Sequence, residues 1–440
     1  MTQHHVIALI ILYFVIVLAI GWWSRKKETN EGFLLANRNL GVFALTGTLL
    51  ASMFGGTAII VTMSFVYDYG AAIIWAFLST TIGCFLLAAL VPKIKKLADK
   101  KKHHTYSDYF FEKYGKQAGT LVASIILLVY FGYLLVQLIA GSIILSTLTT
   151  LTYTAAVVLV GGTIILYVYT AGFRAVVKTD VFQYLIILLL FILSIDIFRN
   201  AQTIPTQELN LLAAGGINTI GFLIYGIMIL FVGAEFWQRI YAAKNNSVAR
   251  KSLIITGTLF FLLGILVVLI GLSVKASFPD IIPTTALIVG FEQLLSGYLL
   301  GIGLVLLFAA VMSSADTFLF VLSTSVSKDF LARKNKQALT KHTQHFTIAI
   351  GILAIIVAIL FDNIVEVVTS IVGISFALFP ATIFSFWYKL HPKAVNISII
   401  LGIAGAILAF ITIGISVEAA LVSLPIALIT LGIMQSIHKN

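Results

Sequence analysis

The sequence predicts an all-α integral membrane protein, because charge is scarce, apolar residues are abundant, and the apolar residues gather in long runs. Of its 440 residues, 60% are hydrophobic and only 10% are charged, and the mean hydropathy is +1.07. Soluble domains carry roughly 25% charged residues, so most of this chain must contact lipid. The runs reach the length of about 20 residues that a membrane-crossing helix needs. They lack two-residue alternation, which favours helices over a β-barrel.

We expect a single transmembrane domain over residues 1–440 with thirteen spans. The spans lie at about 6–23, 41–66, 71–91, 118–148, 154–172, 176–198, 216–237, 253–274, 297–327, 346–361, 363–388, 395–415 and 417–436. The first span is long for a secretory signal, and Trp22, Trp23 and a basic cluster follow it in place of a cleavage site. We therefore expect it to be retained as a helix.

The basic loops predict the orientation of the chain. With the cluster Arg25–Lys27 in the cytoplasm, all of the 28 Lys and Arg residues except Arg199 and Lys275 fall in cytoplasmic segments. This is the positive-inside bias of membrane proteins, and it places the N-terminus outside and the C-terminus in the cytoplasm. The net charge of +11 follows from this topology. The Lys-rich run 93–102 therefore indicates a loop near anionic lipid, and we expect no nucleic-acid partner.

Residue types that support catalysis or hold a cofactor are scarce. Cys84 is the single cysteine, which excludes an intrachain disulfide and a multi-cysteine metal site. All eight histidines lie outside the expected spans, so none forms an intramembrane metal or acid–base cluster. We expect neither an enzyme nor an organic cofactor.

The ninth span carries the most informative polar residues. Ala310, Ser313, Ser314 and Thr317 fall at i, i+3, i+4 and i+7, which is one face of a helix. Hydroxyls and a carbonyl on one face are hard oxygen ligands for a small cation such as sodium. Small polar residues also pack membrane helices together, but the neighbouring carboxylate of Asp316 favours an ion site, because packing needs no charge.

Two spans contain glycines that predict a broken helix. Gly55 and Gly56 follow Ala51–Phe54 in the second span, and Gly233 precedes Glu235 in the seventh. A break at membrane depth is tolerated where it lines a cavity. Interrupted helices in corresponding halves of a chain are the best sequence indication of a transporter site.

Four sequence blocks occur in a characteristic order: Asn39-Leu40-Gly41, the segment AGFRAVVKTD at 171–180, Gln238-Arg239 with Ala242–Lys244, and Ala309–Thr317. Together they resemble the sodium/solute symporter family, which includes proline, sugar, pantothenate and sialic acid carriers. The resemblance covers most of the chain from about residue 32 to 390.

The resemblance implies a LeuT-type fold of two inverted five-helix repeats. The repeats would be 41–198 and 216–388, with one helix before them at 6–23 and two after them at 395–436. It also implies sodium as the coupling ion, at a site between the second and ninth spans. Carried over residue by residue, the ligands would be the carbonyls of Ala51, Phe54 and Ala310 and the hydroxyls of Ser313 and Ser314.

Some family members bind a second sodium nearby, at positions that match Asp180, Ser313, Asp316 and Thr317. Here Asp316 replaces a serine that occurs in those members. The extra carboxylate would strengthen a second sodium site or carry a proton. Met53 stands where proline carriers have an aspartate, so the role of that carboxylate is absent.

The solute pocket is expected beside the broken helices. By analogy its lining would comprise Ser52, Gly55, Gly56, Thr57, Gln137, Tyr225, Glu235 and Phe376. Helix packing explains each of these residues equally well, and Glu235 has an alternative partner in Arg239, one helical turn on. The block Glu235–Arg239 does not match proline or sugar carriers, so we do not assign the substrates of those carriers to this chain.

These features predict a sodium-coupled symporter that imports a small organic solute, such as an amino acid, sugar, carboxylate or urea-like compound, by alternating access. Asp180 and Asp316 motivate an alternative, a proton-coupled carrier on the same scaffold. A membrane solute sensor is the alternative from another class, and we expect no attached kinase. The compact chain suggests a bacterial inner membrane. The sequence does not define the oligomeric state, and a monomer is compatible with it.

Overall fold

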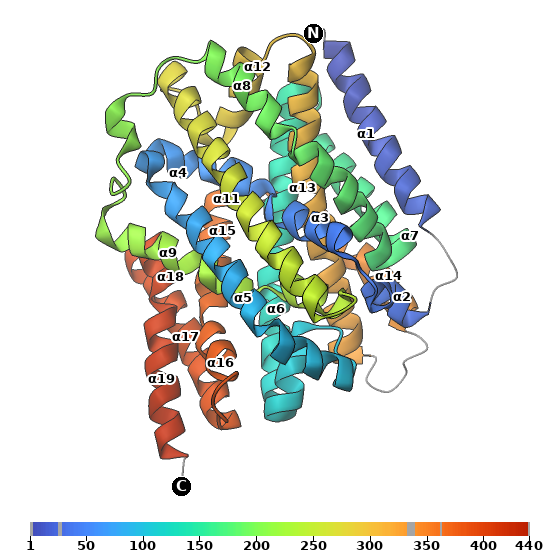
Figure 1. Ribbon diagram of the computed structural model, residues 1–440, viewed down its shortest axis with the longest axis vertical. Coiled ribbons are helices and arrows are strands. Elements are labelled where there is room, and N and C mark those ends of the chain that lie inside the picture. Colours follow the sequence, from blue (N-terminus) through green and yellow to red (C-terminus); the bar gives the residue numbers. More distant parts are fainter. Residues whose placement is uncertain (1–2, 25–28, 332–338, 361–362, 439–440) are drawn as a thin grey trace.

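The computed structural model describes residues 3–24, 29–331, 339–360 and 363–438, and these ranges form helices joined by turns (Figure 1). The described residues contain no strand. One isolated bridge joins Leu40 to Ala243, with Lys244 N donating to Leu40 O at 3.0 Å. The expectation of an all-α protein is therefore confirmed for the described part of the chain.

The described residues of the first half of the chain form eight α-helices and four shorter helical turns. They are α1 (Gln3–Trp23), α2 (Asn30–Leu35), η1 (Ala36–Arg38), α3 (Val42–Met53), η2 (Thr57–Val61), α4 (Thr62–Tyr69), η3 (Gly70–Ile73), α5 (Ile74–Lys101), α6 (Tyr106–Leu148), α7 (Tyr153–Ile187), α8 (Leu190–Asn200) and η4 (Thr206–Leu209).

The second half begins with α9 and ends with α19. Its elements are α9 (Gly215–Val232), α10 (Ala234–Ala242), α11 (Asn246–Ser277), η5 (Pro283–Thr285), α12 (Ala286–Leu294), α13 (Tyr298–Ser325), η6 (Val326–Leu331), α14 (Leu339–Leu360), α15 (Ile364–Phe376), α16 (Phe379–Phe384), α17 (Pro392–Ile413), α18 (Val417–Leu421) and α19 (Ser423–Ile437).

Eleven helical stretches of the described residues are long and apolar enough to cross a membrane, while α1 and α3 contribute shorter apolar helices. Every one of the expected spans overlaps at least one of these helices. The number thirteen stays a prediction, because length and composition alone select eleven. The short helix α12 lies in a segment that we expected to be a loop.

The centre of the bundle is formed by α6 and α13, whose apolar stretches are the most buried (Figure 1). Large apolar side chains are instead exposed on peripheral helices, including Leu408 and Ile411 of α17 and Ile429 of α19. Lipid tails are as apolar as leucine, so such a surface is stable inside a bilayer. The pattern agrees with an integral membrane protein.

Both predicted helix breaks are present. In the first, α3 ends at Met53, and the chain resumes helical structure in η2 and α4. In the second, α9 ends one residue before Gly233 and α10 begins one residue after it. Trp237 Nε1 donates to Phe231 O at 2.9 Å, which satisfies a carbonyl at the end of α9.

The chain turns within α7 at Gly172, the last residue of the fifth expected span. This residue has a φ of 58°, which favours glycine. A Cβ there would lie 2.6 Å from the ring of Phe33 in α2. Close approach of α2 and the positive φ both explain why a glycine stands at this point.

Gly226 of α9 allows a test of the packing between α5 and α9. A Cβ on Gly226 would lie 2.2 Å from the backbone nitrogen of Thr80 in α5. We expect Gly226→Ala to destabilise the detergent-purified protein, since overpacking typically costs about 1–3 kcal/mol. Gly432 of α19 is the matched control, because nothing lies within 4 Å of its Cβ position. Equal melting temperatures for Gly226→Ala and Gly432→Ala would contradict the close contact of α5 and α9.

Candidate ion and solute site

The break after α3 lies against the middle of α13. Ser313 Oγ is 2.6 Å from Ala51 O and 3.0 Å from Ala310 O, within hydrogen-bond distance of both. Ser314 Oγ donates to Ser52 O at 3.0 Å. The structure therefore brings together three of the five predicted sodium ligands, and a fourth, Ser314, bonds to the adjacent carbonyl. All of these residues are buried.

The glycine pair of the break allows a close approach of three helices. A Cβ on Gly55 would lie 2.1 Å from Ser314 Oγ of α13 and 2.9 Å from Gln137 Oε1 of α6. The same Gln137 oxygen accepts a hydrogen bond from Gly56 N at 2.7 Å. Gln137 thus satisfies an amide in the interrupted segment, which is a more specific role than a general bond between helices.

Two further predicted positions lie in the same segment. Phe54 N bonds to Leu50 O at 3.0 Å, and the backbone then leaves the helix at Phe54, with a ψ of 54°. The carbonyl of Phe54 follows this turn and belongs to the irregular part of the backbone. The side chain of Thr57 lies outside the described residues.

A buried guanidinium lies at the predicted second cation site. Arg239 Nη2 of α10 donates to Asp180 Oδ2 at 3.1 Å and to Thr317 Oγ1 at 2.8 Å. Thr48 of α3 donates to the same Asp180 oxygen and lies 3.0 Å from Arg239 Nε. Arg239 therefore links α10 to α3, α7 and α13. Sequence reasoning grouped Asp180 with Thr317 but did not place Arg239 between them.

Asp316 is the second carboxylate beside this guanidinium. Its Oδ2 accepts a hydrogen bond from Thr179 Oγ1 at 3.3 Å. The Oδ1 atoms of Asp180 and Asp316 are both buried and have no hydrogen-bond partner in the described structure. Two ionised carboxylates and one guanidinium would leave an excess negative charge away from water, which is costly. The cluster therefore requires one more positive charge, from a cation or a proton.

Glu235 does not form the alternative ion pair with Arg239. Tyr130 of α6 donates its hydroxyl to the Glu235 carboxylate. Arg239 Nη1 instead reaches the backbone carbonyl of Glu235, at 3.4 Å. The expectation of a pair within one helical turn is wrong, because Arg239 is drawn to Asp180 on a neighbouring helix.

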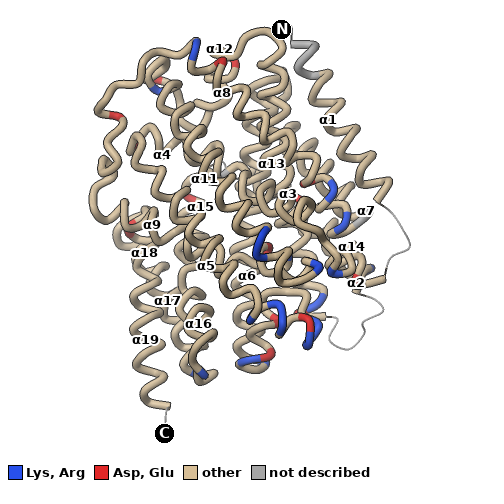
Figure 2. Tube along the Cα trace, in the orientation of Figure 1, with Lys and Arg blue, Asp and Glu red and all other residues tan. Residues whose placement is uncertain are grey.

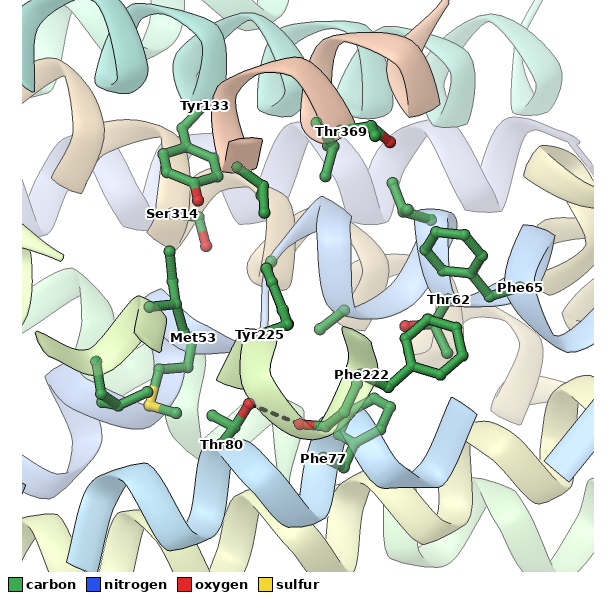
Figure 3. Close-up of a pocket in the computed structure, with 18 of the residues that line it drawn as sticks. Met53, Thr62, Phe65, Phe77, Thr80, Tyr133, Phe222, Tyr225, Ser314 and Thr369 are labelled. Atoms are coloured by element: carbon green, nitrogen blue, oxygen red, sulfur yellow. Dashed lines mark hydrogen bonds between the residues drawn. The ribbon is translucent and has the colours of Figure 1, made fainter. Parts of the chain in front are cut away.

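A cavity of about 170 Å³ adjoins the break in α3 (Figure 3). Six of the predicted solute residues line it, namely Ser52, Gly55, Gln137, Tyr225, Glu235 and Phe376. Sequence reasoning missed most of its aromatic wall, including Phe222 and Tyr133. The available signal was the three-residue spacing of Phe222 from Tyr225 and of Tyr130 from Tyr133, which places each pair on one helix face.

The cavity adjoins the predicted sodium ligands through one of them, Ser314. Ser314 lines the cavity together with Ser52 and Gly55, and its hydrogen bond to Ser52 O is part of the contact between α13 and the break. Two interrupted helices that line one cavity, with buried hydroxyls and carbonyls beside it, are typical of a secondary transporter.

The chain belongs to the sodium:solute symporter family, whose model matches residues 33–402. The resemblance of the four sequence blocks is thereby confirmed. The family comprises transporters and not enzymes, and it favours sodium coupling over the proton-coupled and sensor alternatives.

Curated relatives are similar over most of their length. The sodium/proline symporter 2 of Staphylococcus saprophyticus is 24% identical over 426 residues, covering 87% of this chain and 81% of the relative. The sodium/pantothenate symporter of Escherichia coli is 26% identical over 384 residues, covering 81% and 80%. The osmoregulated proline transporter OpuE of Bacillus subtilis is 22% identical, covering 92% and 88%.

Solved structures confirm the fold. A Na⁺-coupled sialic acid symporter in a substrate-bound outward-open state superposes with a TM-score of 0.87 at 16% identity, covering 98% of this chain and 97% of the other. The nucleobase-cation symporter Mhp1 superposes with a TM-score of 0.63 at 12% identity, covering 92% and 94%. The fold is therefore LeuT-type, as the resemblance implied.

The ion pair between Arg239 and Asp180 predicts how single and double variants of these residues differ in thermal stability. Replacing Arg239 by Gln leaves Asp180 buried without its cation, and breaking such a pair typically costs about 3–5 kcal/mol. Adding Asp180→Asn removes the unpaired charge, so we expect the double variant to regain part of the lost melting temperature. The measurement is thermal unfolding of the purified single and double variants. Additive losses in the double variant would show that the two side chains do not depend on each other.

Proposed function

We propose that the protein binds sodium between the break after α3 and the middle of α13 and uses it to import a small organic solute. The ligands are the carbonyls of Ala51, Phe54 and Ala310 and the hydroxyls of Ser313 and Ser314. The observation that carries this proposal is the position of Ser313 Oγ between Ala51 O and Ala310 O. When sodium binds, the hydroxyl rotates its proton away and offers a lone pair to the ion.

The solute occupies the cavity beside this site. Ser52, Gly55 and Ser314 line the cavity and belong to the break or to the face of α13 that contacts it. Sodium that fixes these residues also completes the solute site, so the two ligands favour each other's binding by the same coupling free energy. Rocking of one repeat against the other then exposes the filled site to the opposite side.

The second site holds one further positive charge near Asp316, Asp180 and Thr317. Arg239 already donates to Asp180 and Thr317, which leaves Asp316 as the carboxylate that a sodium ion or a proton would neutralise. The unpartnered Oδ1 atoms of both carboxylates support this assignment.

The repeats extend over 41–198 and 216–388, and the protein lies in a bacterial inner membrane with its N-terminus outside and its C-terminus in the cytoplasm. Figure 2 supports the orientation, because most Lys and Arg residues lie in the half of the molecule where α19 ends. This charged end would face the cytoplasm under the positive-inside rule.

Ser313 provides the first test of sodium binding. The contact of a hydroxyl oxygen with a cation is comparable to a hydrogen bond to a charged group, which contributes roughly 1.5–3 kcal/mol. Losing one ligand oxygen in Ser313→Ala should therefore weaken sodium binding about tenfold or more. The measurement is the rise in melting temperature with sodium chloride at constant ionic strength, with potassium replacing sodium. Ser323→Ala is the matched control, because Ser323 is buried on the same helix and bonds to Leu319 O at 2.7 Å. A wild-type protein without a sodium-specific rise, or equal responses in both variants, would overturn the site.

Asp316 provides a second test, in proteoliposomes with an imposed potential. Each charge that crosses 100 mV contributes about 2.3 kcal/mol, so losing one coupled cation in Asp316→Asn should lower the limiting accumulation of solute roughly fiftyfold. A lower number of sodium ions moved per solute would identify the second cation as sodium, and a loss of pH dependence would identify it as a proton. Unchanged accumulation would exclude a coupled cation at Asp316.

A further inference from the structure

Among the described residues that line the cavity, Glu235 is the one acidic residue, and none is Lys, Arg or His. An anionic solute would meet this carboxylate with no cationic side chain to balance it. The charge inside the cavity therefore favours a solute with a positive group.

Two neighbouring groups favour the ionised form of Glu235, and neither of them is a cation. Glu235 lies in the first turn of α10, where the positive end of the helix dipole favours negative charge. Tyr130 donates a hydroxyl to it. The nearest guanidinium along the helix, that of Arg239, donates to Asp180 and Thr317. A positively charged solute would supply the missing counter-charge of a carboxylate that is 5% exposed.

The cavity that Glu235 lines has largely aromatic walls. Tyr133, Tyr225, Phe222, Phe318 and Phe376 all line the cavity, and the rings of Tyr133 and Phe318 stack at 5.3 Å. Aromatic faces attract cations, and such sites recognise ammonium ligands. The walls thus favour the same sign of charge as the carboxylate does.

The hydroxyl of Tyr133 is an independent indication of a polar ligand. Tyr133 is 6% exposed, and its buried hydroxyl has no hydrogen-bond partner in the described structure. Figure 3 shows the side chain pointing into the cavity toward Ser314. Because buried polar groups are nearly always satisfied, this hydroxyl calls for a hydrogen-bonding group on the solute.

The size of the cavity limits the solute. Its volume of about 170 Å³ is close to that of engineered cavities of about 150 Å³, which hold one benzene molecule. A compact solute of roughly six to ten non-hydrogen atoms fits this space.

We propose that the transported solute is a compact organic ammonium compound whose positive group lies against Glu235 and the surrounding aromatic rings. This inference rests on the proposed function, in which the cavity is the solute site. It separates this chain from its pantothenate and sialic acid relatives, whose solutes carry a carboxylate and no ammonium group.

The first experiment measures melting temperatures in sodium with primary to quaternary ammonium compounds, each beside an uncharged or anionic isostere. Two such pairs are choline with 3,3-dimethylbutan-1-ol and glycine betaine with 3,3-dimethylbutanoate. We expect at least one ammonium compound to bind with roughly tenfold to hundredfold preference over its isostere, as a charge-assisted contact allows. A panel without any such preference overturns the proposal.

The second experiment repeats the selected pair with Glu235→Gln. A glutamine oxygen still accepts the Tyr130 hydrogen bond, so the fold is retained, and the preference for the ammonium compound should disappear while the sodium-induced rise remains. A retained preference would exclude Glu235 as its source. If the wild-type protein shows no sodium response, the proposed function fails. If the sodium response is present without ammonium preference, only this inference fails.

Discussion

The architecture depends on how the backbone at the break after α3 is satisfied inside the membrane. No water is available in the hydrocarbon core, and each unsatisfied backbone group there costs several kcal/mol. Ser313 and Ser314 donate to carbonyls at the end of α3, and Gln137 accepts from an amide beyond it. The hydroxyls and the amide thus allow an irregular backbone to persist between α6 and α13, the most buried of the eleven helical stretches long enough to cross a membrane.

The short helix α10 carries charged residues of opposite sign at two sites, one helical turn apart. Glu235 in its first turn lines the cavity, while Arg239, one turn further along, joins Asp180 and Thr317. The break at Gly233 is what brings a helix N-terminus to this depth. Without it, the Glu235 carboxylate would lie in a continuous helix, where backbone amides are already paired and the dipole gives it no support.

Local patterns in the sequence predicted the parts of the site that lie on one helix. The face containing Ala310, Ser313 and Ser314 follows from helical periodicity, and the breaks follow from Gly55, Gly56 and Gly233. The LeuT-type fold followed from the resemblance of whole motifs. Contacts between elements far apart in the sequence could not be predicted in this way. Arg239 and Asp180 are 59 residues apart, and Gln137 and Gly56 are 81 apart. Helical periodicity does not predict contacts between residues so far apart in the sequence. It therefore suggested Glu235, one helical turn away, as the partner of Arg239.

The positions of Glu235 at the cavity and Arg239 in the carboxylate cluster determine which charges move across the membrane potential. The charge of Arg239 is fixed in the protein and balanced within its cluster, so it is not carried across with the solute. A sodium ion carries one charge, worth about 2.3 kcal/mol per 100 mV, and an ammonium solute without a carboxylate adds a second charge of the same value. For such a solute, the membrane potential alone makes inward movement energetically favourable. The contribution of sodium would then lie in ordering Ser52, Gly55 and Ser314 around the cavity, which makes ion binding a condition for solute binding as well as a source of energy.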